Sequence, residues 1–373
     1  MRSEKLSVGR LRLATTATAL VLASPATSLS SEPVALGETS TAAASHTQRP
    51  VHNPSSPRWE LSLDERWFQA DRHYIGDVRQ IYREREHTQT INDINIFGLE
   101  LAHPLSARAR VTFTIPFLVA SRSQVLTNQS GSPIDRFATQ SAGLRDVRII
   151  TDFWLRDPRE VPLWNVSIGS GVVIPTGNDS VHDVFEILDP ATGQIRARQQ
   201  PVDTSIQPGS GGWGFPLRFS AYAQASSRWK AYLDGTYIIT PQDTNGVATY
   251  LPNPYEAVIS IPDSYVARAG AEYKTPVAGA VISLGARMEG TPVHDLVGSS
   301  DGFRRPGYVV SAEPGISVTL GGSSLSVKIP VSVYSNRLRS LADERWSDAT
   351  GRYIWGDAIY PAFSIITRVS THW

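Results

Sequence analysis

Cysteine is absent from this sequence of 373 residues, and so is any long apolar run beyond the N-terminal region. A membrane-spanning helix needs about 20 consecutive apolar residues, and the mean hydropathy of the chain is −0.19. These absences exclude a polytopic helical membrane protein. They leave room for a membrane barrel, because barrel strands alternate apolar and polar residues and so resemble soluble proteins in average hydropathy. A chain without cysteine also suits passage through an oxidising periplasm.

A surplus of basic residues is absent as well. The chain contains 35 Lys and Arg and 35 Asp and Glu, so nothing in the charge balance suggests a nucleic-acid partner.

Recognisable catalytic and metal-binding motifs are also missing. The eight histidines are scattered and form no HExxH pattern. The sequences 169–171 and 209–211 read Gly-Ser-Gly, which is not the GxSxG form of a nucleophile elbow. The acidic residues between 179 and 189 lack the spacing of an EF-hand loop and are typical of a solvated loop. We therefore expect no catalytic residue, no cofactor and no bound metal, and we predict that the protein is not an enzyme.

The first 30 residues have the organisation of a secretory signal peptide. Basic residues come first, and an apolar run from Leu13 to about Ala23 is followed by small residues. The next stretch is small, polar and spotted with proline, so it buries too little apolar surface to become ordered. The sequence thus predicts a signal peptide over 1–30, a flexible periplasmic segment over 31–57 and the folded domain over 58–373.

Alternation with a period of two dominates the folded domain. In 108–119, Val111, Phe113 and Ile115 share one face, and Arg110 and Thr112 lie on the other. A strand places such residues on two opposite sides, whereas a helix would scatter them around its axis. The same alternation recurs in 144–155, 163–174, 213–224, 229–239 and 325–334. Weaker strands are predicted in 59–68, 94–103, 263–274, 279–290, 307–319 and 357–373, which gives about twelve strands.

The connections between these strands alternate in length. Short turns are expected near 104–107, 156–162, 225–228, 275–279 and 320–324. Longer polar connections are expected near 70–93, 121–142, 176–211, 241–262, 291–306 and 337–356. This order is typical of an antiparallel up-and-down barrel in the bacterial outer membrane, with short periplasmic turns and long external loops. The sheet has to close because every backbone N–H and C=O in hydrocarbon must be paired.

Aromatic residues near the predicted strand ends support a membrane barrel. Amphipathic rings favour the membrane interface, and such positions are held by Trp59, Trp164, Trp213, Trp229, Tyr308 and Trp373. The chain also ends on Trp373, with Val369, Ile365 and Phe363 at alternate positions before it. This ending resembles the C-terminal signal of bacterial outer-membrane barrels, which implies outer-membrane lipids and the barrel-assembly machinery as partners.

Charged residues on the polar faces of the strands are the candidate functional residues. In a barrel they line the lumen, where they either tune the selectivity of a pore or pair across strands and stiffen a closed barrel. Both interpretations remain open on sequence alone. The candidates are Arg148, Asp152, Arg218, Lys230, Asp234, Arg268, Glu272, Arg287, Glu289, Glu313 and Lys328.

Several short motifs resemble one family of bacterial barrels. They are Gly143-Leu144-Arg145-Asp146-Val147, Ile174-Pro175-Thr176-Gly177-Asn178, Ser205-Ile206-Gln207-Pro208-Gly209, Gly212-Trp213-Gly214 and Thr244-Asn245-Gly246. Their order is similar to the "GxGDV … PTG" signature of the MetA-pathway-of-phenol-degradation family, although Leu144-Arg145 stands where the family has Gly before Asp. The resemblance implies an outer-membrane channel or transporter-like barrel, associated by name with aromatic compounds.

Three functional hypotheses follow. The first is a channel for small molecules, including hydrophobic or aromatic compounds. The second is a structural or adhesive surface barrel without an open pore. The third is a barrel-embedded lipid hydrolase, which would need a serine and a histidine on adjacent strands facing the lipid.

Overall fold

The computed structural model describes residues 59–128, 132–160, 163–189, 192–249, 251–277 and 279–373. The predicted signal peptide over 1–30 and the predicted periplasmic segment over 31–57 lie outside these residues.

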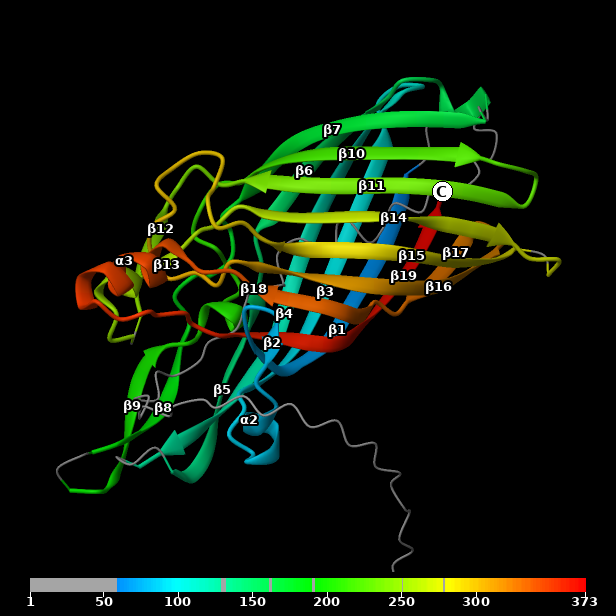
Figure 1. The fold of residues 1–373 in the computed structure, drawn as a ribbon. Helices are drawn as coiled ribbons and strands as arrows, with labels where there is room; N and C mark the ends of the chain where they lie inside the picture. The colour runs from blue at the N-terminus through cyan, green and yellow to red at the C-terminus, as the bar shows by residue number, and fades with distance from the viewer. Residues whose placement is uncertain (1–58, 129–131, 161–162, 190–191, 250, 278) are drawn as a thin grey trace, which may run out of the picture.

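The described residues form a closed, antiparallel barrel of twelve strands, which confirms the predicted fold class. Neighbouring strands follow each other in sequence, and β1 pairs with β19 to close the wall (Figure 1). Two of the barrel strands are interrupted, so that β5 and β6 form one and β17 and β18 form another. The strands are β1 (Glu60–Ile75), β3 (Ile91–Pro104), β4 (Ala109–Thr127), β5 (Pro133–Leu144), β6 (Val147–Trp154), β7 (Trp164–Ile174), β10 (Phe215–Gln224), β11 (Trp229–Ile239), β14 (Ser264–Lys274), β15 (Ala280–Thr291), β16 (Gly307–Leu320), β17 (Ser323–Lys328), β18 (Val331–Arg337) and β19 (Ala358–His372).

The two faces of each strand differ as the alternation predicts. On β4, Phe113 and Phe117 are exposed on the outside of the wall, whereas Thr112 and Leu118 are buried inside. Leu63 on β1 and Leu284 on β15 are likewise exposed apolar residues on the outside. An exposed apolar face of this extent needs lipid around it.

Both ends of the described barrel domain lie at the same end of the barrel. The N–H of Trp59 donates to the carbonyl of Trp373, and that of Trp373 donates to Trp59, each at 3.2 Å. The short turns lie at this end and the long connections at the other, as Figure 1 shows. In an outer-membrane barrel the short turns are periplasmic, so the long connections are extracellular.

Aromatic side chains gather near both ends of the strands. Tyr237 stacks on Tyr265 with ring centroids 6.3 Å apart at the extracellular end, and Tyr308 lies 5.9 Å from Tyr334. We call these four residues the tyrosine row. At the periplasmic end of β11, the ring of Trp229 packs against Tyr273. Trp229 and Tyr237 are eight positions apart on β11. This spacing corresponds to roughly 26 Å of extended strand, which suits the apolar band of an outer-membrane barrel.

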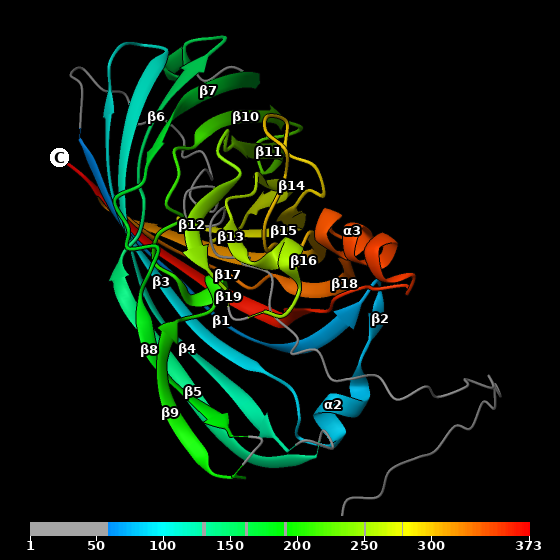
Figure 2. The ribbon, with the colours of Figure 1, turned by 90° about the vertical axis from the view of Figure 1, so that its left-hand side faces the viewer.

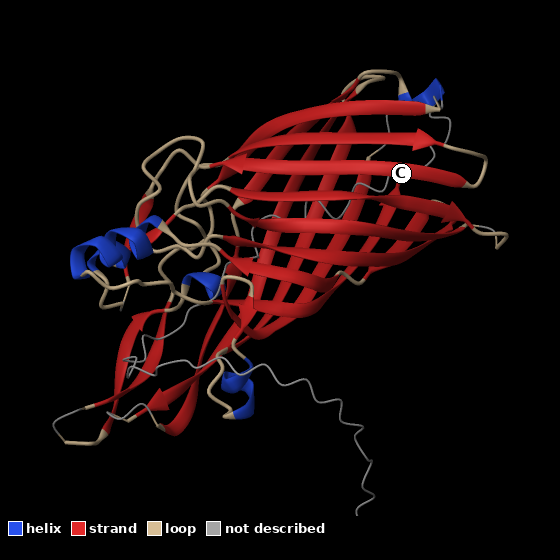
Figure 3. Cartoon of the chain, viewed as in Figure 1, coloured by secondary structure: helices blue, strands red, loops and turns tan. Residues whose placement is uncertain are grey.

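The long connections contain more regular structure than the sequence predicts. The stretch 121–142, expected to be a loop, holds the extension of β4 and most of β5, which pair beyond the membrane. Two further hairpins and two short helices lie in the other external connections (Figure 3). These elements are β2 (Val78–Arg79), α2 (Ile81–Arg85), β8 (His182–Leu188), β9 (Ile195–Pro201), β12 (Thr244–Ala248), β13 (Val258–Ser260) and α3 (Leu341–Thr350), with 3-10 turns at η2 (Thr204–Ile206) and η3 (Pro254–Glu256). A third 3-10 turn, η1 (Pro158–Glu160), lies in the short turn between β6 and β7.

Helix α3 begins and ends at residues that suit a helix boundary. The hydroxyl of Ser340 accepts the N–H of Asp343, whose carboxylate accepts the N–H of Ser340. Gly351 ends the helix in the left-handed conformation. No helix in the described part of the chain has the length and apolarity that crossing a bilayer takes.

The last strand keeps the predicted alternation only up to a bulge. Trp373, Val369 and Phe363 are exposed on the outer face of β19, and Ile365 shares that face. The pairing of β1 with β19 shifts register near Pro361. Each shift changes which residues face inward, so Ile359 is buried inside the barrel instead of continuing the outer row.

The close pairing of β6 and β7 generates a stability prediction. A Cβ at Gly171 would lie 2.0 Å from the carbonyl oxygen of Ile149, whereas a Cβ at Gly235 would meet nothing closer than 3.7 Å. We expect Gly171→Ala to destabilise the barrel by about 1–3 kcal/mol, the usual range for overpacking. The measurement is the midpoint of guanidinium unfolding in detergent. The change in gel migration on heating reports the fraction of folded barrel at each guanidinium concentration.

Gly235→Ala is the matched control, because it adds the same methyl group to a strand of the same sheet. We expect it to leave the midpoint unchanged. Equal midpoints for the two variants would contradict the close approach of β6 and β7.

Candidate functional site in the barrel interior

Charged side chains fill much of the barrel interior, from its periplasmic end up to the level of the tyrosine row. Arg66 on β1 makes a bidentate contact with Glu289 on β15, with N–O distances of 2.6 and 3.1 Å. Arg287 binds the same carboxylate at 2.8 Å and Glu313 at 3.4 Å. Arg268 joins Glu313 at 2.6 Å. Because β1 and β15 are not neighbours in the sheet, the Arg66–Glu289 pair spans the lumen. We call these five residues the central network.

A second group of charges lies at the periplasmic end of β1, β3 and β19. Arg368 contacts the carboxylates of Glu60 at 3.3 Å, Asp64 at 3.1 Å and Glu100 at 2.7 Å. Arg110 adds a second cation to Glu60 at 2.7 Å. All these side chains except Arg110 are almost fully buried. This group therefore fills the lumen beside β1, β3 and β19.

The structure places every predicted lumen residue on the inner face of the wall. Arg218 binds Asp152 at 2.9 Å, Lys230 binds Glu272 at 2.7 Å, and Lys328 lies 3.8 Å from Glu313. Asp234 contacts Arg268 at 3.8 Å. Apart from Lys230, whose head is slightly exposed, the other ten predicted residues are buried, with exposed fractions of 9 % or less. The eleven predicted residues are Arg148, Asp152, Arg218, Lys230, Asp234, Arg268, Glu272, Arg287, Glu289, Glu313 and Lys328.

Sequence reasoning missed Arg66, Glu100 and Arg368, which lie on the strands predicted as weaker. The alternation in 59–68 puts Glu60, Asp64 and Arg66 on one face of the strand. This pattern is the sequence signal that predicts their position in the lumen. Small residues assist the packing as well, because the hydroxyl of Tyr232 lies over two inner glycines of β14 and β15.

The pairing decides between the two interpretations of the lumen charges. A buried charge without a partner is costly, whereas a paired and hydrogen-bonded one is tolerated. Here each anion of the central network contacts two or more cations, and solvent barely reaches any of them. This part of the interior is therefore a packed, ion-paired floor and not a water-filled pore.

This arrangement predicts unequal effects for the two members of one ion pair. Glu289→Gln leaves Arg66 buried without its carboxylate, since Arg66 forms no other ion pair among the described residues. Arg66→Met leaves Glu289 still bound to Arg287. We expect Glu289→Gln to cost about 3–5 kcal/mol of unfolding free energy and Arg66→Met clearly less.

The measurement is guanidinium unfolding of the folded barrel in detergent. The double variant completes the cycle and should be no less stable than Glu289→Gln alone, because it removes the uncompensated charge. Equal losses of unfolding free energy in the two single variants would mean that Glu289 does not compensate the buried charge of Arg66.

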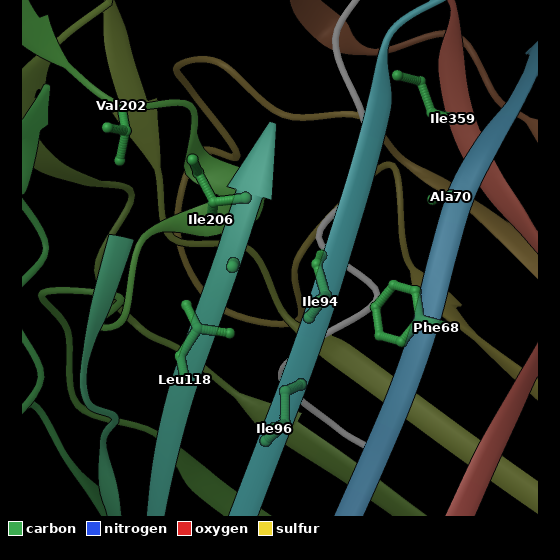
Figure 4. Packing of buried hydrophobic residues seen from close by; sticks show 9 residues of the cluster. Phe68, Ala70, Ile94, Ile96, Leu118, Val202, Ile206 and Ile359 are labelled. Atoms are coloured by element: carbon green, nitrogen blue, oxygen red, sulfur yellow. The ribbon is translucent and has the colours of Figure 1, made fainter. Parts of the chain in front are cut away.

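Above the floor, the interior becomes apolar. Phe68 on β1, Ile94 and Ile96 on β3, and Leu118 on β4 are buried on neighbouring strands. Figure 4 shows these side chains with Val202 and Ile206, which come from the long connection between β7 and β10. The cluster also contains Ala70, Ala120 and Ile359. We call this part of the lumen the apolar chamber, and Val202 and Ile206 of the inserted connection pack into it.

Polar contacts hold the inserted segment in the chamber. The Asp203 carboxylate accepts the N–H of Ser205 at 2.9 Å and starts the turn η2. The Ser205 hydroxyl accepts from the side-chain amide of Asn92 at 3.2 Å. Arg122 lies 3.7 Å from Asp203, and the hydroxyl of Ser141 donates to the carbonyl of Ile206. A layer of polar contacts therefore covers the extracellular side of the chamber.

The barrel wall is interrupted beside this segment. The ladder between β6 and β7 ends at the pair Val147–Ile174. Beyond it, β5 continues along β4, and among the described residues β5 has no ladder with a second strand. Side chains close the wall here instead of backbone pairing.

Asp146 and Thr176 form the main contacts across the interruption. The Asp146 carboxylate accepts the N–H of Gly177 at 3.0 Å and the N–H and hydroxyl of Ser210 at 2.9 and 2.7 Å. The Thr176 hydroxyl accepts the N–H of Val147 at 3.0 Å and donates to the carbonyl of Arg145 at 3.1 Å. We call this set of contacts the wall junction.

The motifs that carry the family resemblance converge at the wall junction. A Cβ at Gly177 would lie 2.6 Å from the Cα of Gly209, so the two backbones need glycine to touch. The side-chain amide of Asn245 donates to the carbonyl of Ser210 at 3.3 Å. Segments far apart in sequence therefore meet where the wall is interrupted.

A cavity of about 590 Å³ lies at the free edge of β5. Its lining comes from the outward residues Val119 and Ser121 of β4, from Gln140 and Ala142 of β5, and from residues 181–183. The N–H of Gln140 donates to the Asp183 carboxylate at 2.7 Å, which links the edge to the inserted connection.

The histidine with an acidic partner does not form a hydrolase site. His73 is buried, and its Nδ1 donates to Asp357 at 2.9 Å while its Nε2 accepts the N–H of Thr90 at 2.9 Å. Both ring nitrogens are thus occupied, which leaves none for a serine. Burial raises the pKa of Asp357, but His73 and Arg83 outweigh it and hold that pKa below its usual value. The described residues contain no group of three or more His, Asp or Glu side chains arranged to hold a metal ion.

Comparison with known proteins supports this fold. The COG4313 outer membrane channel from Pseudomonas putida F1 is similar with a TM-score of 0.53 and 10% identity, over 87% of this chain and 100% of that one. The present chain has the fold of an outer-membrane channel. Two further proteins are similar at TM-scores below 0.5. They are the toluene transporter TodX of Pseudomonas putida (TM-score 0.46, 10% identity, 92% of this chain and 95% of that one covered) and the translocator domain of the autotransporter NalP from Neisseria meningitidis (TM-score 0.45, 12% identity, 87% and 91% covered).

No family model matches the chain, and no curated protein matches it either.

Proposed function

We propose that this protein is an outer-membrane channel that takes up small hydrophobic molecules, aromatic compounds among them. One observation carries the proposal: the interior is divided into an ion-paired floor and an apolar chamber whose side wall is interrupted. A polar solute has no favourable path through the floor, because it would have to separate buried ion pairs. An apolar molecule gains by leaving water for the chamber.

The wall junction offers such a molecule a way out that avoids the floor. Backbone pairing makes a barrel wall impermeable, and between β5 and β7 that pairing is replaced by side-chain contacts. A displacement of the inserted connection opens the chamber toward the lipid without breaking a strand ladder. The convergence of the motifs at this junction also supports membership of the MetA-pathway-of-phenol-degradation family.

The C-terminal residues fit the proposed route of assembly. Trp373, Val369, Ile365 and Phe363 share the outer face of the closing strand β19, where the barrel-assembly machinery can read them before β1 pairs with that strand.

The closed floor predicts selective exclusion of polar solutes. Vesicles that contain the refolded barrel should not swell in sugars or amino acids. Intact Gram-negative cells that express it should take up an apolar probe, N-phenyl-1-naphthylamine, faster than cells with an empty vector. Swelling in sugars would contradict the floor, and unchanged probe uptake would overturn the proposed function.

A control variant shows that the swelling assay can detect an open floor. Replacing Arg268, Arg287 and Glu313 together by alanine removes the centre of the ion-paired network. This variant should swell in small sugars, provided that it still shows heat-dependent gel migration.

A reversible crosslink tests the wall junction. A Cβ at Gly143 would lie 3.6 Å from the Cβ of Pro208, within the range of roughly 3.5–4.5 Å that a disulfide needs. The chain contains no other cysteine, so Gly143→Cys with Pro208→Cys can form only this bond. We expect several-fold slower uptake of the probe in the oxidised form and recovery after reduction.

The two single-cysteine variants are the matched controls and should not respond to reductant. If the oxidised double variant transports as fast as the reduced one, the cargo does not pass the junction. The channel proposal would then survive only with an axial route.

A further inference from the structure

The segment between β1 and β3 presents apolar side chains at the extracellular rim. Val78, Ile81 and Tyr82 are exposed, with exposed fractions of 63, 45 and 49%. They lie within five consecutive positions, and none of the residues of α2 in this described segment is buried. Figures 1 and 2 both show α2 outside the outline of the barrel. Clustered exposed apolar residues on a rigid segment indicate an interaction surface.

The segment is held in this orientation by contacts on its other side. Arg79 makes two hydrogen bonds to Glu84, at 2.8 and 2.7 Å. Arg83 reaches over the rim to Asp357 at 3.0 Å. Arg136 of β5 donates to the carbonyls of His87 and Gln89 at 2.8 and 2.9 Å. The apolar side chains therefore remain exposed although the backbone of the segment is fixed on both sides.

The segment starts at the level of the tyrosine row. The hydroxyl of Tyr334, itself exposed, donates to the carboxylate of Asp77 at 3.5 Å. Rings of this kind favour the interface between lipid headgroups and acyl chains. The exposed side chains of 78–82 are thus continuous with the outer surface that the membrane covers.

Charge does not explain the surface. Residues 77–86 contain three acidic and three basic side chains, so the segment carries no net charge to attract phosphate groups. Burial of the apolar side chains is the remaining favourable interaction. The partner must therefore present an apolar layer beneath a polar one.

We propose that the segment 78–82 is an interfacial anchor that rests Val78, Ile81 and Tyr82 in the headgroup region of the outer leaflet. The lipid surface is the occupant because the segment is continuous with the tyrosine row. The anchor fixes the extracellular end of β1 against the membrane next to the apolar chamber.

A depth measurement with site-specific labels tests the anchor. Because the chain lacks cysteine, Ile81→Cys carries a single NBD fluorophore, in phosphatidylcholine vesicles with nitroxide lipids. Leu284→Cys on the lipid-facing side of β15 is the positive control, and Tyr353→Cys, 70% exposed beyond α3, is the negative control. We expect shallow nitroxides to quench position 81 more than deep ones, deep nitroxides to quench position 284, and neither to quench position 353.

Quenching at position 81 no stronger than at position 353 would overturn the proposal. So would quenching that appears only at high protein-to-lipid ratio, because it would indicate a second copy of the chain in place of lipid. Heat-dependent gel migration establishes that each labelled variant is folded, and addition of salt should leave the quenching unchanged.

Discussion

Backbone hydrogen bonding in a medium without water is the constraint on which the rest of this structure depends. A strand that crosses hydrocarbon must pair on both edges, so the sheet closes between β1 and β19. Closure creates an interior that must itself be filled. It also makes any interruption of the ladder expensive, and the interruption beside β5 is tolerated because Asp146 and Thr176 supply the missing partners.

The way the interior is filled follows from the same constraint. Every second residue of a strand points inward, and here many of the inward positions hold cations and anions in mutual contact. Glu289 and Glu313 are each shared between arginines of different strands. Shared carboxylates link opposite parts of the wall at defined residues. A dry apolar filling would not specify which residues of opposite strands face each other. The apolar chamber lies only where the inserted connection can cover it.

The sequence predicts the strands of the barrel wall far better than the structure of the long connections. Alternation of apolar and polar residues repeats over nearly every barrel strand, so this pattern alone was enough to place the wall and its inward charges. Arg66 was missed although the alternation of 59–68 places it on the inner face of its strand. The insertion of Ile206 leaves no periodic signal, since it is a lone apolar residue between polar neighbours. In the part of β5 beyond the membrane, 133–142, both faces are largely polar, and alternation disappears although the pairing continues.

The departure from the family motif becomes understandable at the wall junction. Leu144 and Arg145 stand where the barrels that this chain resembles have glycine before aspartate. Leu144 points outward and is exposed. Arg145 serves through its backbone, because its N–H donates to the carbonyl of Pro116 and its own carbonyl accepts from Thr176. The junction uses the side chain of Asp146 and the bare backbones of Gly177 and Gly209, and these are the positions that the chain retains. In this chain these residues supply contacts in place of a strand ladder, and they join segments that are dispersed in sequence.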